Sequence, residues 1–556
     1  HRIARRQRQM CIRDSNKMYY LNLILIFLFA NNLLFAVNSL GHKDEDEKRP
    51  NFIFFITDDQ LKDMMNFLPE GKGKNLTPAT DSLVKDAAVL NNMYVTSPVC
   101  TPSRFACLTG RYPSTSIYKP FLSTTENYDN QTYVQWNTYI TSEDKFTIPW
   151  MLKRNGYYTG IVGKNHVIDC KGIIKAKWND DPSDEQVVKL LKRNAKLLES
   201  ACKAAGFDYA KSLYHNNPSH NGVKALLAHN QDWITSAGIE FIKTAAQGDK
   251  PFFLWCATTL PHGPTDDKRS WKADPRITSE GLLEEPLNVQ PSRESLGLRI
   301  AKSGIRGWQK ENLLWIDDGL GALVNELDKN GVLYNTIIVY FNDHGQRSKG
   351  TIYEGGVHSE AFVWKKEGFP AGYEVKKLIS NVDFAPTILD LAGVDYDADL
   401  YDGESFYNSL NGEKEIERDS LYFELGFVRG VRMGQWKYIA LNFPDTVINM
   451  TLEERQKELD DFNESQIRRG KPVYNADPLA NFSHIRTIPG GGDAEHKSLS
   501  QYPGYYDAHQ LYDLTEDPLE QENLANDPEY AETLSILQNK LIAYLESLPG
   551  GFGDLK

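Results

Sequence analysis

The chain has 556 residues, of which 41% are hydrophobic and 25% are charged, and its formal net charge is −13. This length and composition predict a globular protein with one large domain and one smaller domain. Residues 1–39 carry a net charge of +5, which leaves −18 for the rest of the chain. A body this acidic argues against a general nucleic-acid-binding protein, and no nucleic-acid partner is expected. An anionic substrate would need a pocket in which positive charge is concentrated.

The amino terminus divides into two segments that are set apart from the fold. Residues 1–17 are basic and fit no fold pattern, so we interpret them as upstream or artefactual sequence ahead of Met18. Residues 18–39 are predicted to be a signal peptide, with an apolar core over 21–37 and a cleavage site at Val37-Asn38-Ser39. The alternative is an uncleaved anchor helix, for which the stretch is short. In both cases we expect export of the rest of the chain to the periplasm, the outside or a lysosome-like lumen. If the signal peptide is cleaved, no stable membrane insertion is expected.

Four segments share one pattern, in which an apolar run is followed at once by polar residues. The first is a strand over 52–57 that precedes Asp58 and Asp59, and the second is a helix and a strand to Val162 that precede Lys164 and His166. The third is a strand to about Thr258 that precedes His262. The fourth is a long helix and a strand over 336–341 that precede Asp343 and His344. Strands without alternation, separated by helices, predict a parallel sheet covered on both faces. Ligands bind beyond the carboxyl ends of such strands, which is where these polar residues fall.

The stretch SPVCTPSRFACLTGRYPS, over 97–114, predicts a helix that begins at Cys100. Pro102 suits the first turn of a helix, and Gly110 suits its end. Cys100 would then lie at a helix N-terminus, where anions are favoured, with Arg104 one turn further on the same face. A reactive thiolate and a buried structural thiol are both compatible with that position.

Cysteine usage gives a second reason to single out Cys100. Five cysteines follow the predicted signal peptide, and an odd number leaves one unpaired in an oxidising compartment. Cys100 is the candidate for the unpaired residue. Cys170 and Cys202 could form a disulfide, although sequence alone does not fix the pairing.

The pattern changes near residue 410. The segment DSLYFELGFVRGVRMGQWKYIAL alternates and has a turn at Met433-Gly434, which predicts antiparallel strands. Residues 443–505 are polar and punctuated by Gly and Pro, which predicts long loops, and residues 528–548 predict a closing amphipathic helix. The predicted fold is therefore α/β, with a large mostly parallel sheet between helices over 50–414 and a smaller α+β domain with an antiparallel sheet over 415–556.

The block that begins at Cys100 resembles the signature of the type I sulfatases, which belong to the alkaline-phosphatase-like superfamily. CTPSR over 100–104 matches the Cys-x-Pro-x-Arg core, and LTGR over 108–111 follows it. In that family a formylglycine-generating enzyme reads the core and oxidises the cysteine to formylglycine. The resemblance thus implies that Cys100 becomes the nucleophile. One hydroxyl of the hydrated aldehyde attacks sulfur and the second expels sulfate, an exit that a serine or a thiol lacks.

The resemblance also implies a bound divalent cation, most readily Ca²⁺. Asp58 and Asp59 match the family's paired aspartates, and Asp343 matches its third carboxylate. Adjacent carboxylates repel each other without a cation, and a hard metal with oxygen ligands suits them. His344 holds the fourth position, where many members have Asn and some have His. Because imidazole is less typical of calcium, the choice between Ca²⁺ and Mg²⁺ stays open. Modified Cys100 completes the implied set of ligands.

Further positions match the family's residues for sulfate contact and proton transfer. Lys164 and His166 match its Lys-x-His pair, in which the lysine binds sulfate oxygens and the histidine hydrogen-bonds the formylglycine. His262 in LPHGP matches the histidine that binds sulfate and protonates the leaving oxygen. Lys349 matches a sulfate-contacting lysine in a Lys-Gly-x-x-x-Glu-Gly-Gly-Val stretch. Together with Arg104 these residues would form a positive cluster that stabilises the transferring sulfuryl group.

The resemblance covers residues 51–525 and has two departures. Asn165 stands where many members have Trp, and His358 stands where Arg is usual, so no role is assigned to His358. LYDLTEDPLEQENLA, over 511–525, resembles the family's C-terminal motif and is interpreted as structural.

The implied activity is hydrolysis of a sulfate ester on a small molecule or a glycan. Export and the predicted C-terminal loops favour a carbohydrate, and Arg429, Arg432 and His484 could contact an anionic neighbouring sugar. The ordinary alternative for these three is a solvated residue or one that holds the interdomain surface. A phosphonate monoester or phosphodiester hydrolase of the same superfamily remains open. A non-catalytic binder of sulfated glycans would be expected to lose Cys100, an aspartate of the site or Lys164, and none of these is lost.

Overall fold

The computed structural model describes residues 48–412, 416–468, 470, 472–473, 476–480 and 500–555. The chain forms two units, His1–Arg49 and Pro50–Lys556. The predicted upstream sequence and signal peptide, residues 1–39, lie outside the described residues. Within the described ranges, every helix is too short or too polar to cross a bilayer.

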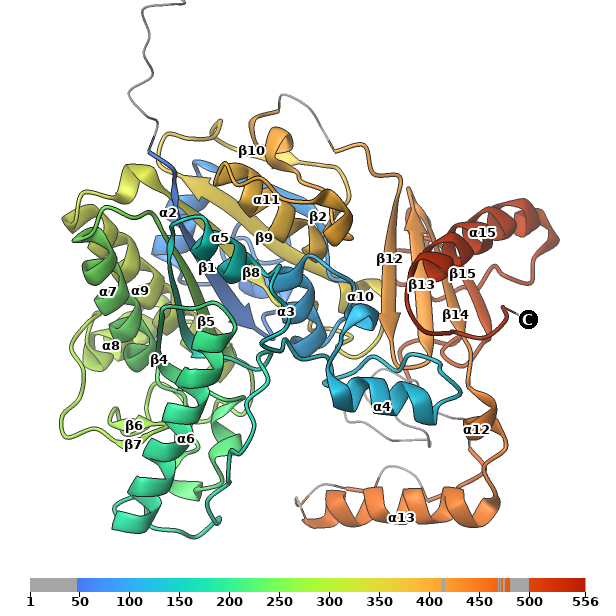
Figure 1. The fold of residues 1–556 in the computed structure, drawn as a ribbon, viewed down its shortest axis with the longest axis horizontal. Helices are drawn as coiled ribbons and strands as arrows, with labels where there is room; N and C mark the ends of the chain where they lie inside the picture. Colours follow the sequence, from blue (N-terminus) through green and yellow to red (C-terminus); the bar gives the residue numbers. More distant parts are fainter. Residues whose placement is uncertain are drawn as a thin grey trace, which may run out of the picture. The chain divides into compact units, whose positions relative to one another are not determined.

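A large sheet organises most of the Pro50–Lys556 unit (Figure 1). Its strands are β1 (Asn51–Asp58), β2 (Ala87–Tyr94), β3 (Tyr158–Lys164), β4 (Tyr209–Tyr214), β5 (Phe252–Pro261), β8 (Thr336–Asn342), β9 (His358–Lys365), β10 (Tyr373–Val375) and β11 (Ile379–Ser380). Their order is β10-β2-β9-β8-β1-β5-β3-β4, and β11 pairs with β2. Among these strands β9 alone runs antiparallel to its neighbours, β2 and β8. The predicted mostly parallel sheet is confirmed, although β5 extends to Pro261 rather than ending near Thr258.

Helices cover both faces of this sheet. The α-helices between residues 50 and 394 are α2 (Pro78–Val84), α3 (Cys100–Thr109), α4 (Lys119–Asn127), α5 (Ile148–Arg154), α6 (Glu185–Ala204), α7 (Gln231–Ala246), α8 (Arg293–Ser303), α9 (Trp308–Lys329), α10 (Glu354–Val357) and α11 (Phe384–Leu391). Along β1, Ile53 and Phe55 belong to one apolar core with residues of α7 and α9, whereas Phe52 and Phe54 belong to the other. The strand is a continuous apolar run because both of its faces are buried.

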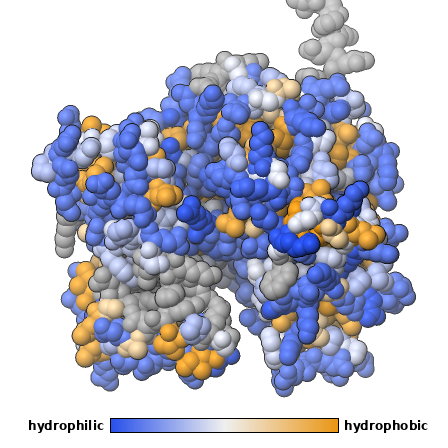
Figure 2. Space-filling model, turned by 180° about the vertical axis from the view of Figure 1, so that it is seen from behind, coloured by the Kyte–Doolittle hydropathy of each residue, from blue (hydrophilic) through white to orange (hydrophobic). Residues whose placement is uncertain are grey.

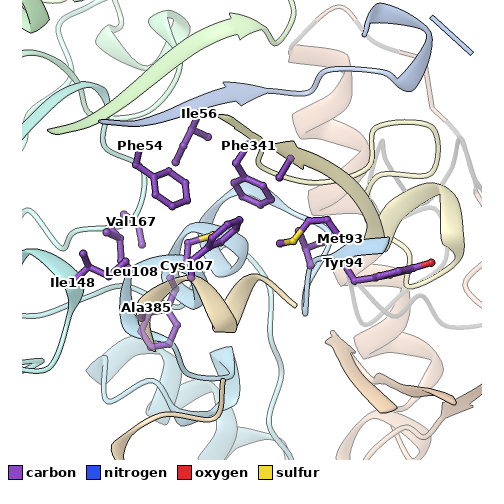
Figure 3. Close-up of a cluster of buried hydrophobic side chains, with 14 of the residues drawn as sticks. Phe54, Ile56, Met93, Tyr94, Cys107, Leu108, Ile148, Val167, Phe341 and Ala385 are labelled. Carbon is purple, nitrogen blue, oxygen red and sulfur yellow. The ribbon is translucent and has the colours of Figure 1, made fainter. Parts of the chain in front are cut away.

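The second of these cores holds helix α3 against the sheet. Figure 3 shows Phe54 of β1 and Phe341 of β8 in one cluster with Cys107 and Leu108 of α3. The ring of Phe54 also meets the ring of Phe384 edge-on, with centroids 5.0 Å apart. Because α3 is fixed by this packing, its first residue is held at the carboxyl edge of the sheet.

A second sheet of four antiparallel strands lies near the carboxyl terminus. Its strands are β12 (Ser420–Leu425), β13 (Val428–Met433), β14 (Trp436–Leu441) and β15 (His509–Asp513), in that order. The predicted antiparallel strands are confirmed, and the turn after β13 places Gly434 at a φ of 56°. Leu537 and Leu541 of α15 (Ala531–Ser547) share an apolar core with Tyr438 of β14. The exact domain boundary between 414 and 415 stays a prediction.

Part of the predicted loop region 443–505 is helical, so that prediction is wrong there. Helices α12 (Asp445–Ile448) and α13 (Leu452–Arg468) occupy it, while residues 481–499 lie outside the described residues. Helix α13 is difficult to recognise because few of its side chains are buried. A start signal was nevertheless present: Thr451 and Glu454 exchange side-chain to backbone hydrogen bonds, the reciprocal pattern of a capping box.

The five described cysteines are all free thiols. The disulfide considered for Cys170 and Cys202 is therefore not formed. Cys202, near the end of α6, is instead a buried member of the apolar core, and Cys170 packs against the same core. Disulfide pairing consequently does not distinguish Cys100 from the other cysteines. Any special role of Cys100 has to be argued from the groups around it.

The face of the molecule shown in Figure 2 is largely hydrophilic. Hydrophobic residues gather there in small groups. Scattered apolar side chains are ordinary on a folded protein and do not by themselves indicate a binding surface.

Candidate active site

The residues predicted to form a site meet at the carboxyl edge of the large sheet. Strands β8, β1, β5 and β3 are neighbours. Asp58 and Lys164 are the last residues of β1 and β3, and Asp343 and His262 directly follow β8 and β5. Helix α3 brings Cys100 to the same edge as its first residue.

Charged groups surround Cys100. Its sulfur is 3.6 Å from Asp58 Oδ1, 3.5 Å from His344 Nε2 and 3.6 Å from Lys349 Nζ. The residue is only 1% exposed. A structural thiol is ordinarily packed among apolar groups, so these contacts favour the reactive interpretation of Cys100.

Two fully buried cations pair with the carboxylates beside Cys100. Arg104 donates through Nε and Nη2 to Asp343 Oδ2, at 3.2 and 3.0 Å. Its Nη2 is also 3.6 Å from Asp58 Oδ2, and Lys164 Nζ donates to the same oxygen at 2.5 Å. Buried carboxylates persist when cations compensate them, so the fold holds both positive groups in fixed places.

A second group of charged contacts, next to the first, joins Asp59 to Lys349 and His344. Lys349 Nζ lies 2.6 Å and His344 Nε2 3.2 Å from Asp59 Oδ1. On the other side of the ring, His344 Nδ1 is 3.0 Å from the carbonyl oxygen of Gly345. A carbonyl oxygen only accepts, so Nδ1 carries a proton and Nε2 faces the carboxylate and Cys100.

Burial and charge act in opposite directions on the pKa values of the site. Burial alone would raise the pKa of Asp58 and Asp59, but Lys164 and Lys349 beside them hold both values below the usual range for aspartate. Burial likewise opposes protonation of His344, yet its neighbouring carboxylates raise the pKa of this histidine well above that of a free side chain. Both aspartates are therefore ionised near neutral pH.

His166 and His262 each contact an asparagine from the loop after β4. His166 Nε2 is 2.7 Å from Asn216 Nδ2, and His262 Nε2 is 3.0 Å from Asn217 Nδ2. His262 Nε2 also lies 3.4 Å from Asp59 Oδ2. Burial, together with nearby lysine and arginine side chains, lowers the pKa of His166 well below its ordinary value, so this ring is neutral at pH 7.

Asn216 and Asn217 were not among the residues predicted from the sequence. They obey the same rule as the other site residues, because they follow a strand of the large sheet. The strand itself, YAKSLY in β4, mixes polar with apolar residues, and Lys211 is exposed. It therefore lacks the apolar run that identifies the other strands in the sequence, and the residues after it could not be recognised as part of the site.

Two site residues adopt a left-handed backbone. Asp59 has a φ of 64° and His166 a φ of 47°. Such conformations cost of order 1–3 kcal/mol in residues other than glycine and gather at functional sites. At Asp59 and His166 the backbone turns sharply after β1 and β3, so that a side chain can face Cys100 or the loop after β4.

The donor groups fit a divalent cation. The ligand atoms of Asp58, Asp59, Cys100 and His262 all lie within 4.8 Å of one another, and so do those of Cys100, Asp343 and His344. Carboxylate oxygens are the preferred ligands of Ca²⁺ and Mg²⁺. The first group includes His262, which the sequence analysis assigned to the substrate rather than to a metal.

A cavity of about 840 Å³ lies at the same carboxyl edge of the large sheet, although no residue of the charged cluster lines it. Gln60, which directly follows Asp59, and Gly345, which directly follows His344, both line it. Side chains from the second sheet and from the loop after β15 complete the wall, and they include Arg432 and Glu520. The volume lies within the ordinary range for a site that holds a small molecule.

The three residues considered for contact with a neighbouring sugar have different outcomes. Arg429 is fully buried and donates to the backbone oxygens of Gly426, Val428 and Thr132, so the hypothesis of a sugar contact is wrong for this residue. Its hydrogen bond to Thr132 links β13 of the second sheet to an earlier part of the chain. This agrees with the alternative interpretation, a residue that holds the interdomain surface. Arg432 lies 3.4 Å from Glu354 on the cavity wall, and His484 lies outside the described residues.

Replacing Arg429 by methionine is expected to lower the free energy of unfolding by about 3 kcal/mol, because several buried carbonyl oxygens lose their donor. The KM for a sulfated substrate should stay unchanged. Chemical denaturation and steady-state kinetics measure the two quantities, with the exposed Arg306→Met as the matched control. A raised KM with unchanged stability would restore the idea of a substrate contact.

The comparisons with known proteins agree with this architecture. A profile of the sulfatase family matches residues 50–394, and a profile of the N-sulphoglucosamine sulphohydrolase C-terminal region matches residues 342–464. An ulvan-active sulfatase of Formosa agariphila is 23% identical over 95% of this chain and 83% of its own length. N-acetylgalactosamine-6-sulfatase of Mus musculus is 24% identical over 73% of this chain and 75% of its own. The solved PsFucS1 sulfatase from Pseudoalteromonas sp. has a TM-score of 0.56, at 17% identity over 93% of this chain and 94% of its own, which supports the fold.

A mostly parallel sheet with this cluster at its carboxyl edge, followed by a small antiparallel sheet, is a fold that the chain shares with the solved PsFucS1 sulfatase. Since the family profile covers more than half of the chain, the protein belongs to the sulfatase family and is a sulfuric ester hydrolase.

Proposed function

We propose that this protein hydrolyses sulfate esters of carbohydrates, with Cys100 converted to formylglycine as the nucleophile and with a bound divalent cation, most readily Ca²⁺. The observation that carries the proposal is the position of Cys100. It begins a buried helix, and its sulfur lies within 3.6 Å of a carboxylate, a histidine and a lysine. A hydrated formylglycine supplies two hydroxyls on one carbon, one to attack sulfur and one to expel sulfate.

The ligands proposed for the cation are Asp58, Asp59, Asp343 and His344, together with the modified Cys100. The cation would act as a Lewis acid toward a sulfate oxygen and favour ionisation of the attacking hydroxyl. Three carboxylates face three permanent cations in this cluster, so the protein charges nearly cancel. A divalent ion would therefore leave the site net positive, as an anionic ester requires.

The remaining residues of the cluster have roles set by their charge and position. Lys164 and Lys349 are proposed to contact sulfate oxygens, and Arg104 to hold the carboxylates and stabilise the charge of the transferring group. His262 lies beside Asp59, and it is proposed to protonate the leaving oxygen. His166 is proposed to hydrogen-bond the formylglycine.

The carbohydrate substrate is supported by the relatives and by the cavity. Relatives over most of this chain are named for ulvan and for N-acetylgalactosamine 6-sulfate. The cavity at the same edge of the large sheet offers aromatic, amide and charged side chains from both sheets, a mixture suited to sugar hydroxyls. We also propose export of the chain, on the basis of the apolar segment that follows Met18.

Maturation is proposed to precede folding. Residues 100–104, the segment that a formylglycine-generating enzyme would read, are all buried in the folded protein. An enzyme cannot reach a segment without exposed atoms, so the modifying enzyme would act on the unfolded chain.

The proposal is tested by producing the protein with a formylglycine-generating enzyme and weighing the tryptic peptide from Asp86 to Arg104. We expect the mass of an aldehyde or its hydrate in place of the thiol. Rates on sulfated sugars and on matched phosphate mono- and diesters should then favour sulfate. An unmodified Cys100 beside a modified control sulfatase would contradict the nucleophile, and faster phosphodiester cleavage would contradict the substrate class.

A further inference from the structure

Strand β4 delivers two asparagines to the active site. It pairs in parallel with β3, and the pairing continues past both strands, since His166 N donates to the carbonyl oxygen of His215 at 3.1 Å. Asn216 and Asn217 come next in the chain. The loop after β4 therefore lies against the ends of β3 and β5, where His166 and His262 are placed.

The amide orientation of Asn216 is fixed by its own neighbour. Asn216 Oδ1 accepts a hydrogen bond from the backbone N–H of Asn217 at 2.8 Å. A backbone N–H only donates, so this contact identifies the oxygen of the amide, and the NH₂ group must be the one that faces His166 Nε2 at 2.7 Å. The oxygen and nitrogen of an asparagine amide are usually difficult to tell apart, and here the hydrogen-bond geometry distinguishes them.

We propose that Asn216 is a positioning residue that sets the tautomer of His166. Because Asn216 donates to Nε2, that nitrogen must hold a lone pair, and the proton of the neutral ring must be on Nδ1. The lowered pKa of His166 agrees with a neutral ring. The inference rests on the proposed function for the role of His166 in hydrolysis, while the tautomer itself does not depend on that role.

The other ring nitrogen explains why the tautomer matters. His166 Nδ1 is buried and has no hydrogen-bond partner among the described residues, and the whole side chain is only 5% exposed. A buried N–H without a partner costs about 1–3 kcal/mol, so such a donor in an active site is expected to meet a ligand. Asn216 thereby reserves one N–H donor of His166 for the reacting group at position 100 or for the substrate.

The first experiment reads the tautomer directly. Protein labelled with ¹⁵N at histidine is examined by long-range ¹H–¹⁵N spectroscopy, and His166→Gln assigns the signal by its loss. We expect the Nδ1–H pattern for His166 in the unmodified protein and in the mature protein. In Asn216→Asp, a carboxylate accepts from the ring, so the proton should move to Nε2 or the ring should become doubly protonated. An Nε2–H pattern in the parent protein would overturn the inference.

The second experiment asks whether Asn216 acts through His166. We expect Asn216→Asp to lower kcat at least about 100-fold, as a wrong tautomer does in a catalytic histidine, with KM changed less than about threefold. In a His166→Gln background the same substitution should have almost no further effect. Ser219→Asp, an exposed position of the same loop, controls for the added charge and should leave kcat unchanged.

The outcomes separate this inference from the proposed function. If Asn216→Asp lowers kcat equally with and without His166, Asn216 does not act through that ring and the inference fails, although hydrolysis stands. If the mature parent protein hydrolyses no sulfate ester, the proposed function fails, and the histidine spectrum of the same protein still decides the tautomer.

Discussion

Replacing Cys100 by serine is expected to abolish turnover, with kcat reduced by a factor on the order of 10⁴ or more. The position of the side chain is conserved in this change, and the charged surroundings of Asp58, His344 and Lys349 remain. What is lost is the second hydroxyl on the same carbon. A serine oxygen can attack sulfur once, but it then has no internal group to expel the sulfate. We therefore expect at most one equivalent of released alcohol per enzyme, followed by no further product.

A pre-steady-state measurement with a chromogenic sulfate ester distinguishes this result from simple unfolding. The host must carry a formylglycine-generating enzyme that modifies cysteine and leaves serine unchanged, which the mass of the 86–104 peptide verifies. Cys107→Ser provides a matched control in the same helix, since Cys107 is buried in the apolar core. It should lose stability while mature Cys100 keeps its activity per folded molecule. Steady turnover by Cys100→Ser would remove the formylglycine mechanism.

The large sheet and most of the site could be predicted because strong local signals and a general rule coincide. Apolar runs such as 52–57 and 336–341 become strands buried on both faces, and polar residues that follow such strands meet at one edge. Asp58 and Asp343 illustrate this. They are 285 residues apart in sequence, yet Arg104 contacts both.

The parts that escaped prediction depend on contacts that no local pattern encodes. Asn216 follows an edge strand without an apolar run, and its partner His166 lies 50 residues away. Arg429 suggested a substrate contact, but its donors are used by backbone oxygens that only the folded chain brings near. Helix α13 has a polar exterior, so its capping residues were a weaker signal than its composition.

Removal of the proposed metal site is the second large effect, and Asp58→Asn is the variant that isolates it. Asp58 lies fully buried between Lys164 and Arg104, so the neutral amide leaves two buried cations without their shared carboxylate. Breaking a buried pair in this way costs about 3–5 kcal/mol. The same change removes one oxygen ligand of the proposed cation. We therefore expect hydrolysis to fall at least about 1,000-fold, and metal binding to weaken as well.

Thermal unfolding with EDTA, Ca²⁺ or Mg²⁺ separates these two consequences, because it needs neither maturation nor substrate. In the parent protein an ion at about 100 times its Kd should stabilise the fold by about 2.7 kcal/mol, and the more effective ion identifies the preferred metal. Asp58→Asn should start from a lower melting temperature and gain much less from either ion. Asp328→Asn, exposed on α9, should behave as the parent does. If dialysed parent protein binds neither ion and EDTA leaves its melting temperature unchanged, the carboxylates serve only to hold Lys164, Lys349 and Arg104 in place, and the charge of those three cations alone must stabilise the sulfuryl group.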